Sequence, residues 1–145
     1  MIGEREMEKI TSLLYCEGAQ NELPPQGGEG KIHLIGPLAK LTPMFIPSMF
    51  SFSLFINIEE IDVRKPHTFK FIFKNPEDKE VLNTQDISIP VQMNVPEVFD
   101  DVPTLSMCMD FRNVALEIEG VYTGEIYIDG KNLGLYPIRA KAVKR

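Results

Sequence analysis

Large apolar residues recur at every second position in several segments of the chain. The even positions of residues 50–58 are Phe, Leu or Ile, and the odd positions of residues 69–73 are all Phe. Residues 87–93 alternate in the same way, with Ile, Val or Met at the odd positions. A period of two is typical of β-strands that bury one face, so these segments predict strands of a half-buried sheet.

Shorter apolar segments extend the pattern toward both ends of the chain. Residues 12–16 and 31–35 are predicted strands, and residues 21–30 between them hold two Pro and three Gly, which predict a loop. In residues 105–118 the apolar side chains change from odd to even positions at Arg112-Asn113. Because strand side chains alternate strictly between faces, this change predicts a turn or a bulge there.

The last hairpin carries the strongest local signal. Residues 122–128 lead into Asp129-Gly130, and Asp-Gly is a favoured hairpin turn because Gly adopts positive φ freely. With a two- or four-residue loop, four apolar side chains are predicted on one side of the hairpin: Ile126, Ile128, Leu133 and Leu135. The other side is predicted to carry Glu125, Tyr127, Tyr136 and Ile138.

About seven to eight short strands, with no βαβ alternation and no long helix, predict an all-β fold. We expect an antiparallel β-sandwich of Ig-like or C2-like type with at most one short helix. Residues 1–11 are highly charged and are predicted to be a flexible or helical arm, and residues 12–145 a single sandwich domain. Pro90 cannot donate to a ladder, which predicts an edge or bulged strand around it. Because alternating apolar residues of one strand lie on the same face, we predict that these faces meet in one core. Its members are Phe52, Leu54, Ile56, Phe69, Phe71, Ile89, Val91, Ile126 and Ile128.

Composition limits the classes of partner. The 145 residues are 43% hydrophobic and 25% charged, with a formal net charge of −6. A net acidic surface repels phosphate backbones and anionic lipids, so we expect no nucleic-acid and no membrane partner. Two cysteines, Cys16 and Cys108, make no disulfide framework, and the first residues show no signal-peptide pattern. These features predict a soluble cytoplasmic protein with free thiols.

Catalytic and metal-binding chemistry has little support in the sequence. The two histidines, His33 and His67, are isolated, and no His-x-x-x-His or Cys-x-x-Cys pair exists. We therefore expect no catalytic residue, no metal site and no cofactor, and we predict that chelation leaves the fold intact.

Two groups of carboxylates leave one alternative open, because sandwich domains can bind calcium between loops with hard oxygen ligands. The first group is Glu59, Glu60 and Asp62, and the second is Glu97, Asp100 and Asp101.

The segment of residues 41–50 is the candidate interaction surface. Six of its ten residues are large and apolar, and two prolines interrupt any regular ladder. Met- and Phe-rich surfaces often bind partners, although such a segment can also fold over the end of a sandwich as ordinary core. The predicted interface residues are Met44, Phe45, Ile46, Met49 and Phe55.

Four parts of the chain form a recognisable series: SLLYCEGAQ, GKIHLIGPLAKLTPMFIP, HTFKFIFKNPEDKEV and the closing hairpin with Gly120, Tyr122, Asp129 and Gly130. In these segments the chain resembles a family of small uncharacterised bacterial and phage proteins. Glu17 replaces a frequent Asp of that family, and Ile46 replaces a frequent Phe. The resemblance implies a β-sandwich and no reaction, because the family is a domain of unknown function.

The sequence therefore favours a non-enzymatic protein-interaction module that binds another protein or itself. The alternative is a β-sandwich that captures a small molecule or calcium with its loop carboxylates. A flat apolar patch would favour the first interpretation, and a deep pocket with converging polar groups would favour the second.

Overall fold

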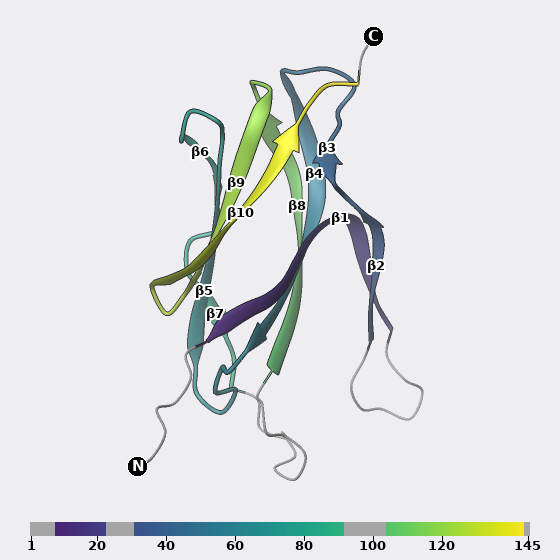
Figure 1. Ribbon diagram of the computed structural model, residues 1–145. Helices are drawn as coiled ribbons and strands as arrows, with labels where there is room; N and C mark the ends of the chain where they lie inside the picture. Colours follow the sequence, from purple (N-terminus) through teal and green to yellow (C-terminus); the bar gives the residue numbers. More distant parts are fainter. Residues whose placement is uncertain (1–7, 23–30, 92–103, 144–145) are drawn as a thin grey trace.

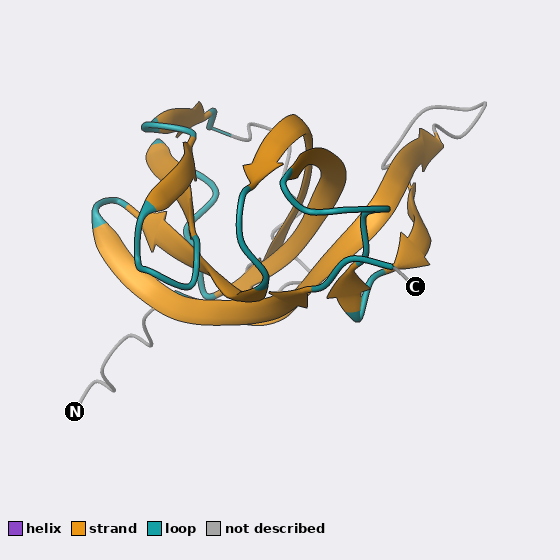
Figure 2. Cartoon of the chain, turned by 90° about the horizontal axis from the view of Figure 1, so that it is seen from above, coloured by secondary structure: helices purple, strands orange, loops and turns teal. Residues whose placement is uncertain are grey.

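The computed structural model describes residues 8–22, 31–91 and 104–143, which form two layers of β-strands (Figure 1). Figure 2 shows the same strands from above, with no helix among the described residues. One layer is a four-stranded antiparallel sheet in the order β2-β1-β4-β8. Its strands are β1 (Lys9–Glu22), β2 (Lys31–Pro37), β4 (Ser48–Glu59) and β8 (Thr104–Leu116).

The second layer is a six-stranded sheet in the order β3-β10-β9-β5-β6, with β7 also paired to β5. Its strands are β3 (Lys40–Leu41), β5 (His67–Lys74), β6 (Glu80–Asn83), β7 (Ile87–Ile89), β9 (Gly120–Ile128) and β10 (Lys131–Ala140). All its pairs are antiparallel except β3 with β10. The predicted antiparallel β-sandwich is confirmed, and the ten strands exceed the expected count because the short β3 and β6 carry no alternation of their own.

Aromatic rings from both sheets fill the space between the layers. Phe52 on β4 lies 5.4 Å from Phe73 on β5, and Tyr15 on β1 lies 5.7 Å from Phe52, measured between ring centroids. The Tyr15 hydroxyl donates a hydrogen bond to the Tyr136 carbonyl of the opposite sheet at 2.7 Å. Burial raises the pKa of Tyr15, so the phenol stays protonated as this donor requires.

Every predicted core residue is buried except Val91, which is 38% exposed. β7 ends at Ile89, and Pro90 follows it without an N–H to continue the ladder with β5. Val91 is therefore not held on the inner face. The prediction that this strand lies at an edge is confirmed for Ile87–Ile89, and residues 92 and 93 of the expected strand lie outside the described residues.

The Asp129-Gly130 turn is confirmed, but the predicted faces after it are partly wrong. Ile128 pairs with Lys131, and both turn residues have positive φ, 52° and 82°. The register then shifts between Asn132 and Gly134. A bulge adds one residue to a strand and so reverses which face later residues occupy.

The consequences of this bulge appear along the rest of β10. Leu133 still packs against the core as predicted. Leu135 is 60% exposed instead of buried, whereas Tyr136 packs against the core and Ile138 is buried.

The change of face predicted at Arg112-Asn113 is confirmed as a bulge in β8. Phe52 pairs with Phe111 and Phe50 with Val114, so Arg112 and Asn113 of β8 lie opposite the single residue Ser51 of β4. Asn113 there has a φ of 57°. At the other end of the sheet, β1 begins at Lys9, so residues 9–11 belong to the sandwich and not to the predicted arm, of which residues 1–7 lie outside the described residues.

Candidate functional site

Three of the predicted interface residues lie on the surface. Met44 is 77% exposed, Phe45 59% and Met49 65%. Met44 and Phe45 lie in the connection that carries the chain from β3 in one sheet to β4 in the other, and Met49 is the second residue of β4. The structure therefore gathers these three at one end of the sandwich, where the chain changes layer.

The other two predicted interface residues lie elsewhere. Ile46 is partly buried and packs against the core, so it anchors the connection instead of joining the exposed surface. Phe55 is half-buried on the outer face of the four-stranded sheet, paired with Leu14 on one side and Cys108 on the other. Phe55 lies six positions after Met49 along β4, a span of about 20 Å. The predicted interface is thus divided between two places.

Polar rows flank Phe55 on the same outer face. On one side the Ser53 hydroxyl donates to Asp110 Oδ1 at 2.5 Å. On the other side the Ser106 hydroxyl donates to Asn57 Oδ1 at 2.7 Å. The hydroxyls and carboxylate are satisfied across strands, so this face is a mixed surface and not a continuous apolar one.

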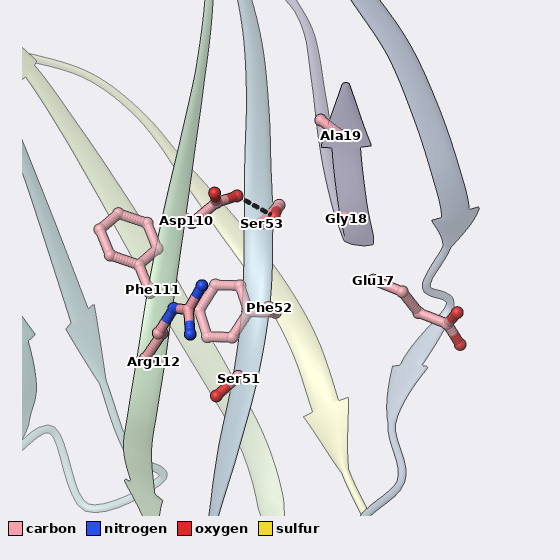
Figure 3. A pocket seen from close by; sticks show the side chains of 9 residues that line it. All are labelled: Glu17, Gly18, Ala19, Ser51, Phe52, Ser53, Asp110, Phe111 and Arg112. Atoms are coloured by element: carbon pink, nitrogen blue, oxygen red, sulfur yellow. Dashed lines mark hydrogen bonds between the residues drawn. The ribbon is translucent and has the colours of Figure 1, made fainter. Parts of the chain in front are cut away.

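A pocket of about 270 Å³ opens where β1 leaves β4 (Figure 3). β1 and β4 pair up to Cys16 and Ser53, after which β1 pairs only with β2. Arg112 on β8 and Phe52 on β4 belong to neighbouring strands, and the Glu17 carboxylate points away from both in Figure 3. The lining residues are Glu17, Gly18, Ala19, Ser51, Phe52, Ser53, Asp110, Phe111 and Arg112.

The chemistry available in this pocket is hydrogen bonding and charge. Ser53 and Asp110 bind each other, and no histidine is among the lining residues to act as a base for the serine. The free thiols nearby are poor nucleophiles, because burial raises the pKa of both Cys16 and Cys108. The pocket can therefore hold a polar group, but it lacks an activated nucleophile.

A second polar cluster surrounds His67, which is an isolated histidine in the sequence. His67 Nδ1 lies 2.7 Å from Asp129 Oδ2, and Nε2 lies 2.7 Å from the Asp62 carbonyl oxygen. Burial lowers the pKa of His67, but these two hydrogen bonds and the nearby carboxylates raise it more, so the net shift is upward. Burial likewise raises the pKa of Asp129, but the bonds from His67 and Thr68 lower it more, leaving it below its usual value.

Glu8 completes this cluster. One ligand-type atom from each of Glu8, His67 and Asp129 lies within 4.8 Å of the others. Sequence spacing gives no signal for this group, since Glu8 belongs to the predicted arm and Asp129 to the predicted hairpin turn. Only the pairing of Phe69 with Ile128 brings the start of β5 to the hairpin.

The loop carboxylates behind the calcium alternative do not form a comparable group. Asp62 Oδ1 accepts a hydrogen bond from the Arg64 amide at 3.0 Å, and its Oδ2 lies 4.0 Å from Lys65 Nζ. Among the described residues Glu59, Glu60 and Asp62 do not converge on one point. The second predicted group, Glu97, Asp100 and Asp101, lies outside the described residues. His33, the other histidine, binds the exposed Glu22 at 2.6 Å.

The fold and these sites define an all-β sandwich with an exposed apolar end and two polar clusters. The chain belongs to a family of unknown function, DUF6941, whose model matches residues 12–141. The predicted membership of an uncharacterised sandwich family is thus confirmed, and its bacterial or phage origin stays a prediction.

Among solved structures the chain is similar to an immunoglobulin-like protein from Pseudomonas aeruginosa, with 14% identity, a TM-score of 0.37, and coverage of 96% of this chain and 100% of that one. No curated protein matches the chain. The described residues include no helix that is long and apolar enough to cross a membrane.

Proposed function

We propose that this protein is a non-enzymatic interaction module that binds another protein or itself through Met44, Phe45 and Met49. The observation that carries the proposal is the exposure of these three large apolar side chains at one end of the sandwich. Interface centres are depleted in charge and rich in Met and aromatic residues, which matches this surface. We name it the Met44–Met49 surface, defined by Met44, Phe45 and Met49.

The backbone that presents this surface is fixed, which favours binding over ordinary loop exposure. The Lys141 amide donates to the Leu41 carbonyl at 2.9 Å, and the Val143 amide donates to the Pro43 carbonyl at 2.8 Å. Pro43 is buried and Ile46 packs against the core. A segment anchored on both sides loses little conformational entropy on binding, so its apolar side chains contribute more of their burial to affinity.

The absence of an enzymatic role is also part of the proposal. The Ser53–Asp110 pair has no imidazole beside it in the described pocket, and each histidine is engaged by a carboxylate elsewhere. We further propose a cytoplasmic location in a bacterial or phage-infected cell, on the strength of the acidic charge and free thiols.

The decisive experiment compares Phe45→Ser/Met49→Ser with Leu135→Ser. Leu135 is as exposed as Phe45 but lies on β10, so Leu135→Ser controls for the loss of any exposed apolar side chain. Self-association is measured by light scattering over a concentration series, and partner binding by quantitative capture from the native host. The double variant is expected to lose association or capture, while its stability changes by no more than about 0.5 kcal/mol for each surface substitution.

Two results would contradict the proposal. If the double variant unfolds, the Met44–Met49 surface is core material. If both variants associate and capture as the parent protein does, the contact lies elsewhere, and the half-buried Phe55 face is the next surface to examine.

A further inference from the structure

His67 is buried, and both of its ring nitrogens face oxygen atoms that can only accept. The Asp62 carbonyl requires a proton on Nε2, 2.7 Å away. In the neutral ring the Nδ1 lone pair would then point at the carboxylate oxygen of Asp129, also at 2.7 Å. At this distance the two atoms share a proton in a hydrogen bond. A metal ion bound to Nδ1 would replace that proton, with the two atoms moving slightly apart.

The groups around Nδ1 are held in place by the fold. The Thr68 amide donates to Asp129 Oδ1 at 2.9 Å, and the Asp129 amide donates to the Thr68 carbonyl at 2.9 Å. This fixes one carboxylate oxygen and leaves Oδ2 toward the imidazole. Glu8, just before β1, brings a second carboxylate to the same place, and Figure 1 shows the start of β1 beside the β9–β10 turn.

We propose that Glu8, His67 and Asp129 bind a divalent transition-metal ion of the zinc type. The ligands would be His67 Nδ1 and one carboxylate oxygen each from Glu8 and Asp129, with a fourth position left for water or a partner's side chain. Their separations of no more than 4.8 Å require only small movements, because ligands of one tetrahedral zinc ion lie about 3–4 Å apart.

The surroundings of the ring suit this role. A metal-binding histidine typically donates its other N–H to a carboxylate or a backbone carbonyl, which fixes the ring and its tautomer. The contact from His67 Nε2 to the Asp62 carbonyl has this arrangement. An imidazole ligand also favours zinc-like ions over calcium or magnesium, which prefer oxygen ligands alone.

The metal would compete with two positive groups. In the metal-free protein a proton joins His67 Nδ1 and Asp129 Oδ2 in their 2.7 Å hydrogen bond, and Lys131 Nζ lies 4.0 Å from Glu8 Oε1. Binding replaces the proton on Nδ1. The hydrogen bonds of Asp129 to Thr68 do not depend on the metal, so chelation is still expected to leave the sandwich folded. This inference does not rest on the proposed function, because the two sites use different residues.

The test is calorimetric titration of the tag-free full chain with zinc chloride, with calcium and magnesium chlorides as comparison ions. Two variants remove one ligand each, Glu8→Gln and Asp129→Asn. The second keeps an oxygen acceptor for the Thr68 amide, and Asn tolerates the positive φ of this turn. Asp78→Asn is the matched control, because Asp78 also has a positive φ in a turn, 66°, but belongs to no such cluster.

The expected result is one zinc ion per chain, with the affinity lowered at least about tenfold in Glu8→Gln and Asp129→Asn and unchanged in Asp78→Asn. Zinc at 100 times its Kd should raise the melting temperature by about 5–10 °C, an effect that EDTA reverses. Cobalt(II) bound to the protein should lack the sulfur-to-metal charge-transfer absorption of a thiolate site.

Three results would overturn the assignment. The first is no zinc binding at micromolar concentrations, and the second is equal binding by the parent protein and both ligand variants. The third is a thiolate absorption with cobalt, which would move the site to Cys16 or Cys108.

Discussion

Phe71 belongs to the cluster of aromatic rings between the sheets. It is fully buried, and its ring stacks on Phe111 with centroids 5.3 Å apart and on Phe73 at 5.9 Å. Phe71→Ala is therefore expected to lower the free energy of unfolding by about 3–5 kcal/mol, because it leaves a cavity in addition to losing apolar burial. Chemical denaturation of this variant beside Leu135→Ala, at an exposed position, measures the difference. A Phe71→Ala melt equal to the parent's would contradict the core assignment.

Gly124 lies so close to the same aromatic rings that no side chain fits at this position. A Cβ at this position would lie 2.5 Å from the Tyr15 hydroxyl oxygen and 2.6 Å from Phe71 Cε1. Gly124→Ala is expected to destabilise the protein by about 1–3 kcal/mol, since rings must shift in an already filled core. Gly18→Ala on β1 is the control, because nothing lies within 4 Å of its added Cβ. Equal thermal stability of the two variants would refute this explanation.

At the scale of elements, the β9–β10 hairpin depends on the backbone of its turn. Gly130 has a φ of 82°, yet a Cβ there would meet no atom within 4 Å. Gly130→Ala therefore isolates the cost of the left-handed backbone, which we expect to be about 1 kcal/mol. Urea denaturation of Gly130→Ala and Gly18→Ala checks this. If Gly130→Ala lowers the free energy of unfolding less than Gly18→Ala does, the positive φ at Gly130 does not limit the turn to glycine.

At the scale of the whole molecule, the Tyr15–Tyr136 hydrogen bond joins the two sheets directly. Tyr15→Phe leaves the Tyr136 carbonyl without this donor inside the sandwich, at an expected cost of about 1–3 kcal/mol. Tyr136→Phe removes a hydroxyl for which the described residues supply no hydrogen bond, and so provides a matched control. The free energies of unfolding of the two variants are compared by calorimetry. If Tyr136→Phe destabilises the protein more than Tyr15→Phe does, the inter-sheet hydrogen bond does not have the proposed role.

The two candidate sites also differ in how many segments of the chain form them. The Met44–Met49 surface comes from one short segment, so its composition could be recognised in the sequence. The Glu8–His67–Asp129 cluster comes from three segments that only the six-stranded sheet and the start of β1 bring together. It could not be found from spacing, because 62 residues separate His67 from Asp129.

The sequence by itself determined the fold class and most of the core. Alternating Phe and Ile residues fix which face of β4 and β5 is buried, and Asp129-Gly130 fixes the position of the turn, because both are local properties of the chain. The two-residue length of the loop is seen only in the pairing of Ile128 with Lys131. It also located the bulge at Arg112-Asn113, where the apolar parity changes.

Tertiary structure decided the rest. The bulge near Gly134 reversed the predicted faces of Leu135 and Ile138. Apolar residues occupy odd positions at Leu133 and Leu135 and even positions at Tyr136 and Ile138, so the pattern alone did not place the bulge before Leu135. Ile46 and Phe45 are both large and apolar, and only packing decided that Ile46 joins the core while Phe45 stays exposed. His67 acquired its partners in the same way, because hydrogen bonding between distant strands depends on register and not on any pattern within one strand.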